Sequence, residues 1–190
     1  MGGPDMTLET RQGLPDALRI LVRDYPRDLW ESHRNFDALT RFWLDRHLGF
    51  RAMLADIGRD TQAFLDGATD PRRYGGQSAR RVGGLLRDLQ GHHQIEDLHY
   101  FPQLAKAEPR LARGFELLDQ DHHALELHIH AMADATNALL RTLAAAPADS
   151  KAAAAAVLDH STRFGRFINR HLLDEEDLVV PVILHHAPDL

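Results

Sequence analysis

Apolar residues recur at alternating spacings of three and four along most of the chain, which is the period of an amphipathic helix. The pattern fills four long stretches, and none of them shows the sustained two-residue alternation of a strand. The third stretch is the most regular, with inward positions at Leu111, Phe115, Leu118, His122, Leu125, Ile129, Met132, Thr136, Leu139 and Leu143. The pattern therefore predicts an all-α fold with four long helices.

Proline, glycine and polar clusters separate the four stretches. The breaks lie at 66–76, 107–109 and 147–150, and an N-terminal extension ends near Tyr25 and Pro26. Helices of roughly 25–38 residues joined by short connections indicate an antiparallel up-down-up-down four-helix bundle. Residues 14–24 predict an additional short N-terminal helix that packs across the bundle. We therefore expect an extension with that helix over residues 1–27 and the bundle over residues 28–190.

Composition restricts the class of protein further. The chain of 190 residues is 44% hydrophobic and 26% charged, which is ordinary for a one-domain globular protein. Its net charge of -6 argues against a nucleic-acid partner. No apolar run approaches the ~20 residues that span a membrane. Because the N-terminus is polar and acidic, unlike a signal peptide, the expected location is the cytoplasm.

Two residue types are unusual in number. The chain has no cysteine, which excludes thiolate zinc sites, iron–sulfur clusters and cysteine nucleophiles. It has 13 histidines, more than a surface needs. Since imidazole is a common metal ligand, this excess directs attention to a metal site.

Each of the four predicted inward stripes contains one histidine: His47, His92, His122 and His171. Glu96 and Glu175 follow the second and fourth of these by four residues, which places each pair on one helix face. The surrounding segments repeat, because HHQIEDLHYFP and HLLDEEDLVVP both have acids four and five residues after the histidine and proline ten residues after it. The chain therefore consists of two similar hairpins, an arrangement that suits two metal ions bridged by carboxylates.

Depth along the predicted helices is an independent check on this cluster. Counted from the first break at 1.5 Å per residue, His47 lies at ~30 Å and His92 at ~24 Å. Counts from the other two breaks place the remaining four residues at the same level. His33 is also on the first stripe, but it lies some 14 residues too far along. The count therefore selects His47.

Two interpretations of the cluster remain open. In a metal-free core, salt bridges between histidine and glutamate would offset the cost of burying two carboxylates. In a metal centre, the cations would offset it. Imidazole and carboxylate without sulfur fit iron, manganese or zinc, and bridging carboxylates favour iron or manganese. A ferritin-like centre is less suitable, because only Glu96 and His99 have the Glu-x-x-His spacing.

The same residues resemble the motifs of the hemerythrin-like family, the HHE cation-binding domain, over residues 35–186. HHQIEDLHYFP is similar to the family's HHxxEExxLFP, HLLDEEDLVVP to HLxxEExxVFP, and DHHALELHI to its third-helix pattern. The resemblance implies two non-haem iron ions with terminal ligands His47, His92, His122 and His171 and bridging ligands Glu96 and Glu175. It also implies that the centre reacts with O2, peroxide (H2O2) or nitric oxide (NO) in sensing or stress protection.

One position departs from the oxygen-carrying members of the family, which have a fifth histidine four residues after the third-helix ligand. Here it is Glu126, which the resemblance makes a metal ligand or a neighbour of the ligands. Its negative charge would favour ferric iron, so we expect rapid oxidation in air rather than reversible oxygen carriage. His93 and Glu176 are one step off the inward stripes, so we expect them to be neighbours of the ligands or alternate ligands, while His99 and Tyr100 flank the site and can hydrogen-bond to ligands. The alternative functions are iron storage without turnover and a bundle that the metal only staples; no protein partner is identified.

Overall fold

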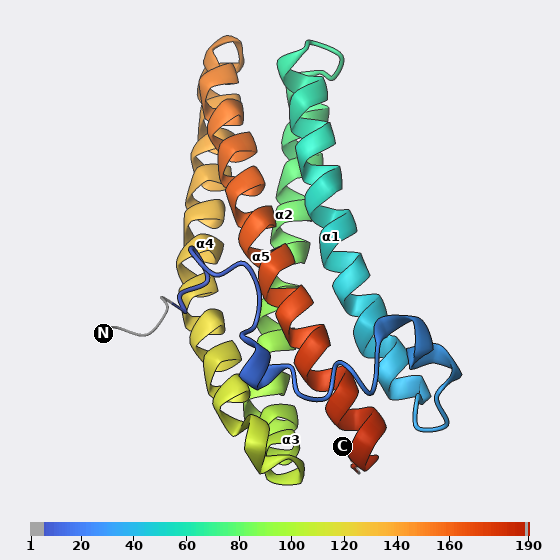
Figure 1. The fold of residues 1–190 in the computed structure, drawn as a ribbon. Helices are drawn as coiled ribbons and strands as arrows, with labels where there is room; N and C mark the ends of the chain where they lie inside the picture. Colours follow the sequence, from blue (N-terminus) through green and yellow to red (C-terminus); the bar gives the residue numbers. More distant parts are fainter. Residues whose placement is uncertain (1–5, 189) are drawn as a thin grey trace. The chain divides into compact units, whose positions relative to one another are not determined.

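The computed structural model describes residues 6–188 and residue 190 of the chain. Their regular structure is entirely helical, with five α-helices and no strand in this part of the chain, so the predicted all-α class is confirmed. The α-helices, coloured along the sequence in Figure 1, are α1 (Ala38–Leu65), α2 (Pro71–Ile95), α3 (Phe101–Ala107), α4 (Ala112–Ala145) and α5 (Lys151–His186). A π-helical turn, η3 (Glu96–Tyr100), joins α2 to α3, so these three elements together form the second predicted helix.

The chain divides into two compact units. Unit 1 contains the chain up to Leu48 together with residues 92–124 and 169–190, and unit 2 contains residues 49–91 and 125–168. The four long helices α1, α2, α4 and α5 each contribute a segment to both units. Among the described helices, none has the length and apolar character that crossing a membrane requires. The cytoplasmic location stays a prediction.

Unit 2 is built from two hairpins. A short turn joins α1 to α2, and Gly67 in it has a φ of 80°, a conformation that glycine adopts without strain. The aromatic rings of Phe64 and Tyr74 stack across this hairpin, with centroids 4.4 Å apart. In the second hairpin, η5 (Pro147–Asp149) joins α4 to α5. His128 of α4 packs there against Phe167 of α5, with centroids 4.4 Å apart.

Unit 1 has a large apolar core, to which α1, α3, α4, α5 and the residues before α1 contribute. The buried residues include Trp43 of α1, Phe101 of α3, Phe115 of α4 and Leu178 of α5. Gly114 allows α4 and α5 to approach each other closely, because a Cβ at this position would lie 2.8 Å from the Leu178 side chain. The core therefore holds four helical segments in fixed contact in the part of the chain that carries the predicted site.

Residues 14–24 differ from the prediction, because they do not form an α-helix. They contain the 3-10 turn η1 (Asp16–Leu18) and further turns. Most backbone bonds in this stretch reach back three residues instead of four, from the donors Leu18, Arg19, Val22 and Asp24. A segment this short propagates an α-helix poorly, and the tighter 3-10 bonds satisfy the same apolar spacing. The inward side chains Leu14, Leu18 and Leu21 are still buried in the unit 1 core.

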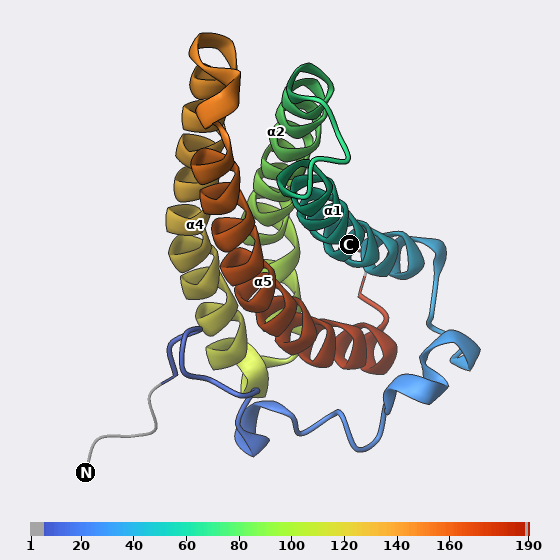
Figure 2. The same ribbon diagram turned by 90° about the horizontal axis from the view of Figure 1, so that it is seen from above.

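The N-terminal segment, residues 6–37, crosses the helices of unit 1 before α1 begins. Figure 2 shows it passing from α4 along α5 towards the start of α1. Its second 3-10 element is η2 (Arg27–Ser32), and Asn35 donates a hydrogen bond of 2.7 Å to the carbonyl of Leu184 in α5. The first five residues of the predicted extension 1–27 lie outside the described residues. The segment is thus packed on α4 and α5 rather than helical.

Candidate metal centre

The four predicted histidines meet in unit 1, each from a different helix. His47 of α1 and His171 of α5 are fully buried, His122 of α4 is buried, and His92 near the end of α2 is partly buried. Nε2 of His47 lies 3.0 Å from Nε2 of His92. Nε2 of His122 lies 3.0 Å from Nε2 of His171. The imidazoles therefore form two close pairs, and in each pair the Nε2 atoms of the two rings face each other.

The two predicted glutamates lie between these pairs, and both are fully buried. Glu96 faces His92 of one pair at 2.9 Å and His122 of the other at 3.8 Å. Glu175 faces His47 at 3.5 Å and His171 at 3.6 Å. Each carboxylate thus approaches one histidine of each pair, which is the placement that a bridging ligand requires.

A second set of carboxylates holds the far side of three imidazoles. Nδ1 of His47 lies 3.1 Å from Glu176, Nδ1 of His122 lies 2.7 Å from Asp97, and Nδ1 of His171 lies 3.3 Å from Asp121. A carboxylate only accepts hydrogen bonds, so these contacts place the imidazole proton on Nδ1. Nε2 of each neutral ring then carries a free lone pair, as metal-ligating histidines do.

The charges of the cluster are arranged unfavourably for a core without a cation. Burial raises the pKa of Glu175 well above its usual value, and the negative charge of Glu96 raises it further. Burial also acts to raise the pKa of Glu96, but the charge and hydrogen bond of His92 outweigh it and lower that pKa. Burial lowers the pKa of three rings, His47, His93 and His171. Neutral imidazoles and a carboxylate pair of like charge are what a cation stabilises.

Several buried polar atoms test the fit of a metal more directly. Oε2 of Glu96, both carboxylate oxygens of Glu175 and Nε2 of His93 have no hydrogen-bond partner among the described residues. Leaving such groups unsatisfied in a core is costly. All of them are metal-ligating atoms, and they belong to residues of one cluster. The donor set therefore fits metal ions.

His93 is a ligand candidate that the stripe pattern ranked below His92. It is buried, and its ring stacks on His122 with centroids 3.9 Å apart. The possible ligand atoms form two groups, each within 4.8 Å: His93, His122 and His171 in one, and His47, His92, Glu96 and Glu175 in the other. The adjacent histidines in HHQIE are the sequence signal, since both can turn inward where the helix leads into a π-helical turn.

Glu126 is not brought to this cluster. Its side chain is exposed on α4, and it belongs to none of the groups of possible ligands among the described residues. The reason is helical register, because Leu125 and Ile129 are buried and take the inward positions after His122. The structure thus offers His93, and not Glu126, as the further ligand. Of the two flanking residues, His99 is exposed and Tyr100 is half-buried.

A third group, Glu108, His185 and His186, lies elsewhere in unit 1. Both histidines are exposed, as expected for helix-end residues. Arg110 already binds both oxygens of the Glu108 carboxylate, at 2.8 and 2.6 Å. Because an arginine neutralises its only carboxylate, this group is a weaker candidate for a cation.

The π-helical turn η3 positions Glu96. Phe101 donates to the Glu96 carbonyl across five residues, and Pro102 follows at once. Proline has no N–H and its ring crowds the carbonyl four residues back, so Pro102 removes the α-helical hydrogen bond to Leu98 and disfavours a regular α-helix there. The wider π turn accommodates this, and such turns are frequent at functional sites.

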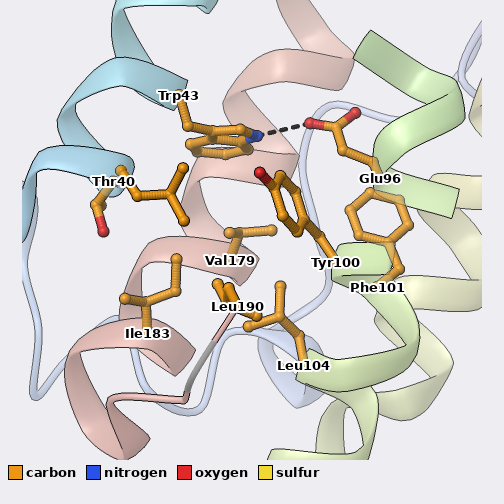
Figure 3. Close-up of a pocket in the computed structure, with 10 residues that line it drawn as sticks. Thr40, Trp43, Glu96, Tyr100, Phe101, Leu104, Val179, Ile183 and Leu190 are labelled. Atoms are coloured by element: carbon orange, nitrogen blue, oxygen red, sulfur yellow. Dashed lines mark hydrogen bonds between the residues drawn. The ribbon is translucent and has the colours of Figure 1, made fainter. Parts of the chain in front are cut away.

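An apolar pocket borders Glu96. Its lining includes Trp43, Tyr100, Phe101 and Leu104, and Figure 3 shows the Trp43 indole N–H directed at the Glu96 carboxylate. That hydrogen bond is 2.6 Å long. The pocket has a free volume of about 10 Å³, which is room for roughly one water-sized molecule. The centre therefore has a small, apolar space beside one of its carboxylates.

Fold and site together define an all-helical protein with a buried imidazole and carboxylate centre suited to cations. The chain belongs to the family described as Hemerythrin HHE cation binding domain, which matches residues 38–183. The predicted family is thus confirmed, and with it the binding of metal cations as the property of the domain. No curated protein and no solved structure matches the chain. The family match begins where α1 begins, so the N-terminal segment lies outside it.

Proposed function

We propose that the protein holds two iron ions in this cluster and that they react with O2, NO or H2O2 in sensing or stress protection. The observation that carries the proposal is the pair of facing nitrogens on His122 and His171, 3.0 Å apart. Both rings hold their proton on Nδ1, so two lone pairs face each other. That contact is repulsive unless a metal cation, or a second proton on one of the rings, lies between the nitrogens, and the cation is the alternative that we propose.

Each ion has its own set of donors in this proposal. His47 and His92 hold one ion, while His122, His171 and His93 hold the other. Glu96 and Glu175 lie between the two sets and bridge them. Imidazole and carboxylate fit iron, and the same donors also accept manganese or zinc. We further propose that the four long helices form the antiparallel bundle, which the short connections between them support.

The protein's own residues favour a small uncharged reactant. Two ferrous ions held by these residues would supply electrons to reduce the reactant. The pocket beside Glu96 is apolar and holds about one small molecule, which suits O2 and NO better than the more polar H2O2. Trp43 fixes one oxygen of Glu96 and leaves the other free towards His122. The carboxylates behind His47, His122 and His171 keep Nε2 of those rings unprotonated.

The test is anaerobic iron loading of the purified protein, followed by metal analysis and optical titration. We expect close to two ions per chain, with most of them lost in His92→Ala and Glu96→Ala. The exposed Glu116→Ala variant is the matched control. A rapid optical change on adding O2 or NO to the loaded ferrous protein supports the reactive centre. Two ions without any such change would establish storage or a structural staple, and absence of bound metal would establish a salt-bridged core.

A further inference from the structure

Two arginines of the N-terminal segment bind carboxylates that are hydrogen-bonded to histidines of the candidate metal centre. This segment lies before residues 38–183, the part that matches the family. Arg11 reaches Asp121, the partner of His171, and Arg27 reaches Glu176, the partner of His47. The two contacts are separated by 110 and 149 residues along the chain, so only the folded segment creates them.

Arg11 is buried at the contact of the segment with α4 and α5, and its side chain is only 2% exposed. Nη1 donates to Oδ1 of Asp121 at 3.1 Å, and Nη2 donates to Oδ2 of the same carboxylate. Nε donates to Asp174 at 2.8 Å. Arg11 thus binds Asp121 through two parallel bonds, which fix the plane of that carboxylate. Oδ2 of Asp121 is the atom that faces Nδ1 of His171.

Arg27 makes the corresponding contact on the other half of the centre. Nη1 donates to Oε2 of Glu176 at 2.6 Å, and Nε donates to Asp177 at 2.9 Å. The second oxygen of Glu176, Oε1, faces Nδ1 of His47 at 3.1 Å. Each arginine therefore binds a carboxylate that accepts a hydrogen bond from Nδ1–H of an imidazole.

We propose that Arg11 and Arg27 are positioning residues of the metal centre, each holding the carboxylate that fixes the tautomer and orientation of one ligand histidine. Arg11 acts on His171 through Asp121, and Arg27 acts on His47 through Glu176. The N-terminal segment is therefore a part of the centre and not only a cover for α4 and α5. The consequence for the ions rests on the function proposed above, whereas the consequence for the tautomers concerns the metal-free protein alone.

The physical reason is the burial of the two carboxylates. Asp121 is 3% exposed and Glu176 is 5% exposed at the side chain, so neither has water to replace a lost guanidinium. Without its arginine, such a carboxylate is no longer held in place and turns away from the imidazole. This movement removes the acceptor from Nδ1, and the imidazole proton then redistributes to Nε2. A ring protonated at Nε2 has no lone pair there for a metal ion.

The first experiment measures ring tautomers by 15N NMR of the metal-free protein. In Arg11→Met we expect the Nε2 signal of His171 to move towards the protonated range while that of His47 stays in place. In Arg27→Met we expect the reverse. One control separates this from simple loosening of the segment. Arg19→Met removes an arginine of the same segment that binds Asp177 and is as exposed as Arg27, 42%. This control should move neither signal.

The second experiment measures iron affinity of the same variants by competition with a chelator. Partners behind metal ligands change affinity by about 10–100-fold, so we expect a loss of about tenfold or more in Arg11→Met and Arg27→Met, and none in Arg19→Met. If Arg11→Met fails to fold, Arg11→Lys is the substitute, because lysine keeps a cation beside Asp121. We expect its loss of iron affinity to be smaller than about tenfold, and any tautomer change to affect His171 and not His47.

The two proposals fail in different ways. If the wild-type protein binds no metal but the tautomers shift as expected, the proposed function is wrong and the positioning role stands. If the wild-type protein binds two ions while both tautomers and affinity are unchanged in the arginine variants, the positioning role is wrong. Equal shifts of both histidines in all three methionine variants would also overturn it, because they would show a general loosening of the fold.

Discussion

At the scale of single residues, one step around a helix separates a ligand candidate from a surface residue. His93 directly follows His92, yet both rings reach the cluster. The buried positions run from Leu85, Leu89 and His93 of α2 to Glu96 of η3, and His92 is partly buried beside them. Glu126 is also one step from an inward residue, but Leu125 and Ile129 occupy the buried positions of α4 and leave it exposed. Periodicity alone therefore cannot rank neighbouring residues whose directions differ by one helical step.

This placement gives a paired prediction for His93 and Glu126. Removing the His93 imidazole should weaken binding of the ion that His93 shares with His122 and His171. His93→Ala should therefore lower the affinity for one of the two ions about 10–100-fold. Glu126→Ala should leave both affinities unchanged. Chelator competition with metal analysis measures both. An equal loss in the two variants would show that Glu126 reaches the cluster in solution.

Two acids that contact Nδ1 of the histidines are part of the sequence repeat, but their role was not predicted. The acids five residues after His92 and His171 are Asp97 and Glu176. Each holds Nδ1 of a histidine in the other hairpin, His122 for Asp97 and His47 for Glu176. The repeat therefore contained a signal for the role of these two acids. It contained no such signal for Asp121, which precedes His122, because the residue that precedes His47 is Arg46 and not an acid.

The raised pKa of Glu175 predicts a pH dependence of the metal-free protein. Burial and the charge of Glu96 keep its folded pKa above the ordinary 4.5. Its contribution to stability is therefore full below pH 4.5 and is lost as pH rises through the folded pKa. His47 and His171 act in the opposite sense, since lowered pKa values remove stability only as pH falls below 6.5.

Calorimetry from pH 6.5 upward isolates the effect of Glu175. A difference of one bound proton between the folded and unfolded states changes the free energy of unfolding by about 1.4 kcal/mol per pH unit. At this chain length, each kcal/mol shifts Tm by about 2–4 °C, so Tm should fall by up to about 3–5 °C per pH unit. Glu175→Gln has no proton to lose, and its Tm should be flat over this range. A wild-type Tm that rises with pH would contradict the assignment. The exposed Glu116→Gln variant should behave as wild type.

At the scale of elements, the four long helices were predictable and their ends were less so. The apolar period predicted each of them, but α2 begins at Pro71, inside the expected break 66–76. Proline suits the first helical turn, where its missing N–H has no intrahelical partner. The N-terminal stretch 14–24 kept the apolar spacing and formed 3-10 turns instead, because spacings of three satisfy both kinds of helix.

The π-helical turn η3 could not be predicted from periodicity, yet it carries Glu96. We predict that Pro102→Ala lets Leu98 to Pro102 become regular α-helix and removes the extra residue of the π turn. Glu96 and Asp97 would then rotate away from His122. The variant should have more stable local helix but an iron affinity about tenfold lower or more. Hydrogen exchange at residues 96–104 and chelator competition measure the two effects.

Pro181→Ala is the matched control for this prediction. Pro181 occupies the corresponding place ten residues after His171, but it lies within the regular helix α5. Its replacement should leave the position of Glu175 and the iron affinity unchanged. A loss of affinity in Pro181→Ala as large as that in Pro102→Ala would show that helix regularity, and not the π turn, determines the site.

At the scale of the whole molecule, the sequence repeat and the folded centre agree closely. The histidines and the buried glutamates Glu96 and Glu175 occupy matching places in the two hairpins, and each glutamate faces its own histidine and one from the other hairpin. The repeat could predict this set because both copies are local in sequence. It could not predict Arg11 or Arg27, whose partners lie more than a hundred residues away and have no periodic signal.

The centre also determines what metal removal should do to the whole fold. Without cations, unit 1 contains two fully buried glutamates with unsatisfied oxygens in its core. A ligand that binds only the folded state stabilises it by about 4 kcal/mol at a free concentration of a thousand times its Kd. At 2–4 °C per kcal/mol, each ion should therefore raise Tm by about 8–16 °C.

Calorimetry with zero, one and two equivalents of iron under anaerobic conditions measures this effect. We expect Tm to rise on loading and to return to the metal-free value when a chelator is added. The double variant Glu96→Gln, Glu175→Gln is the informative comparison, because neutral amides remove the like charges that destabilise the metal-free core. Its metal-free Tm should be at least that of the metal-free wild type, while loading should raise it far less. If the double variant were instead much less stable than the metal-free wild type, the glutamates would be partners in a salt-bridged core, and the cluster would need no cation to stabilise it.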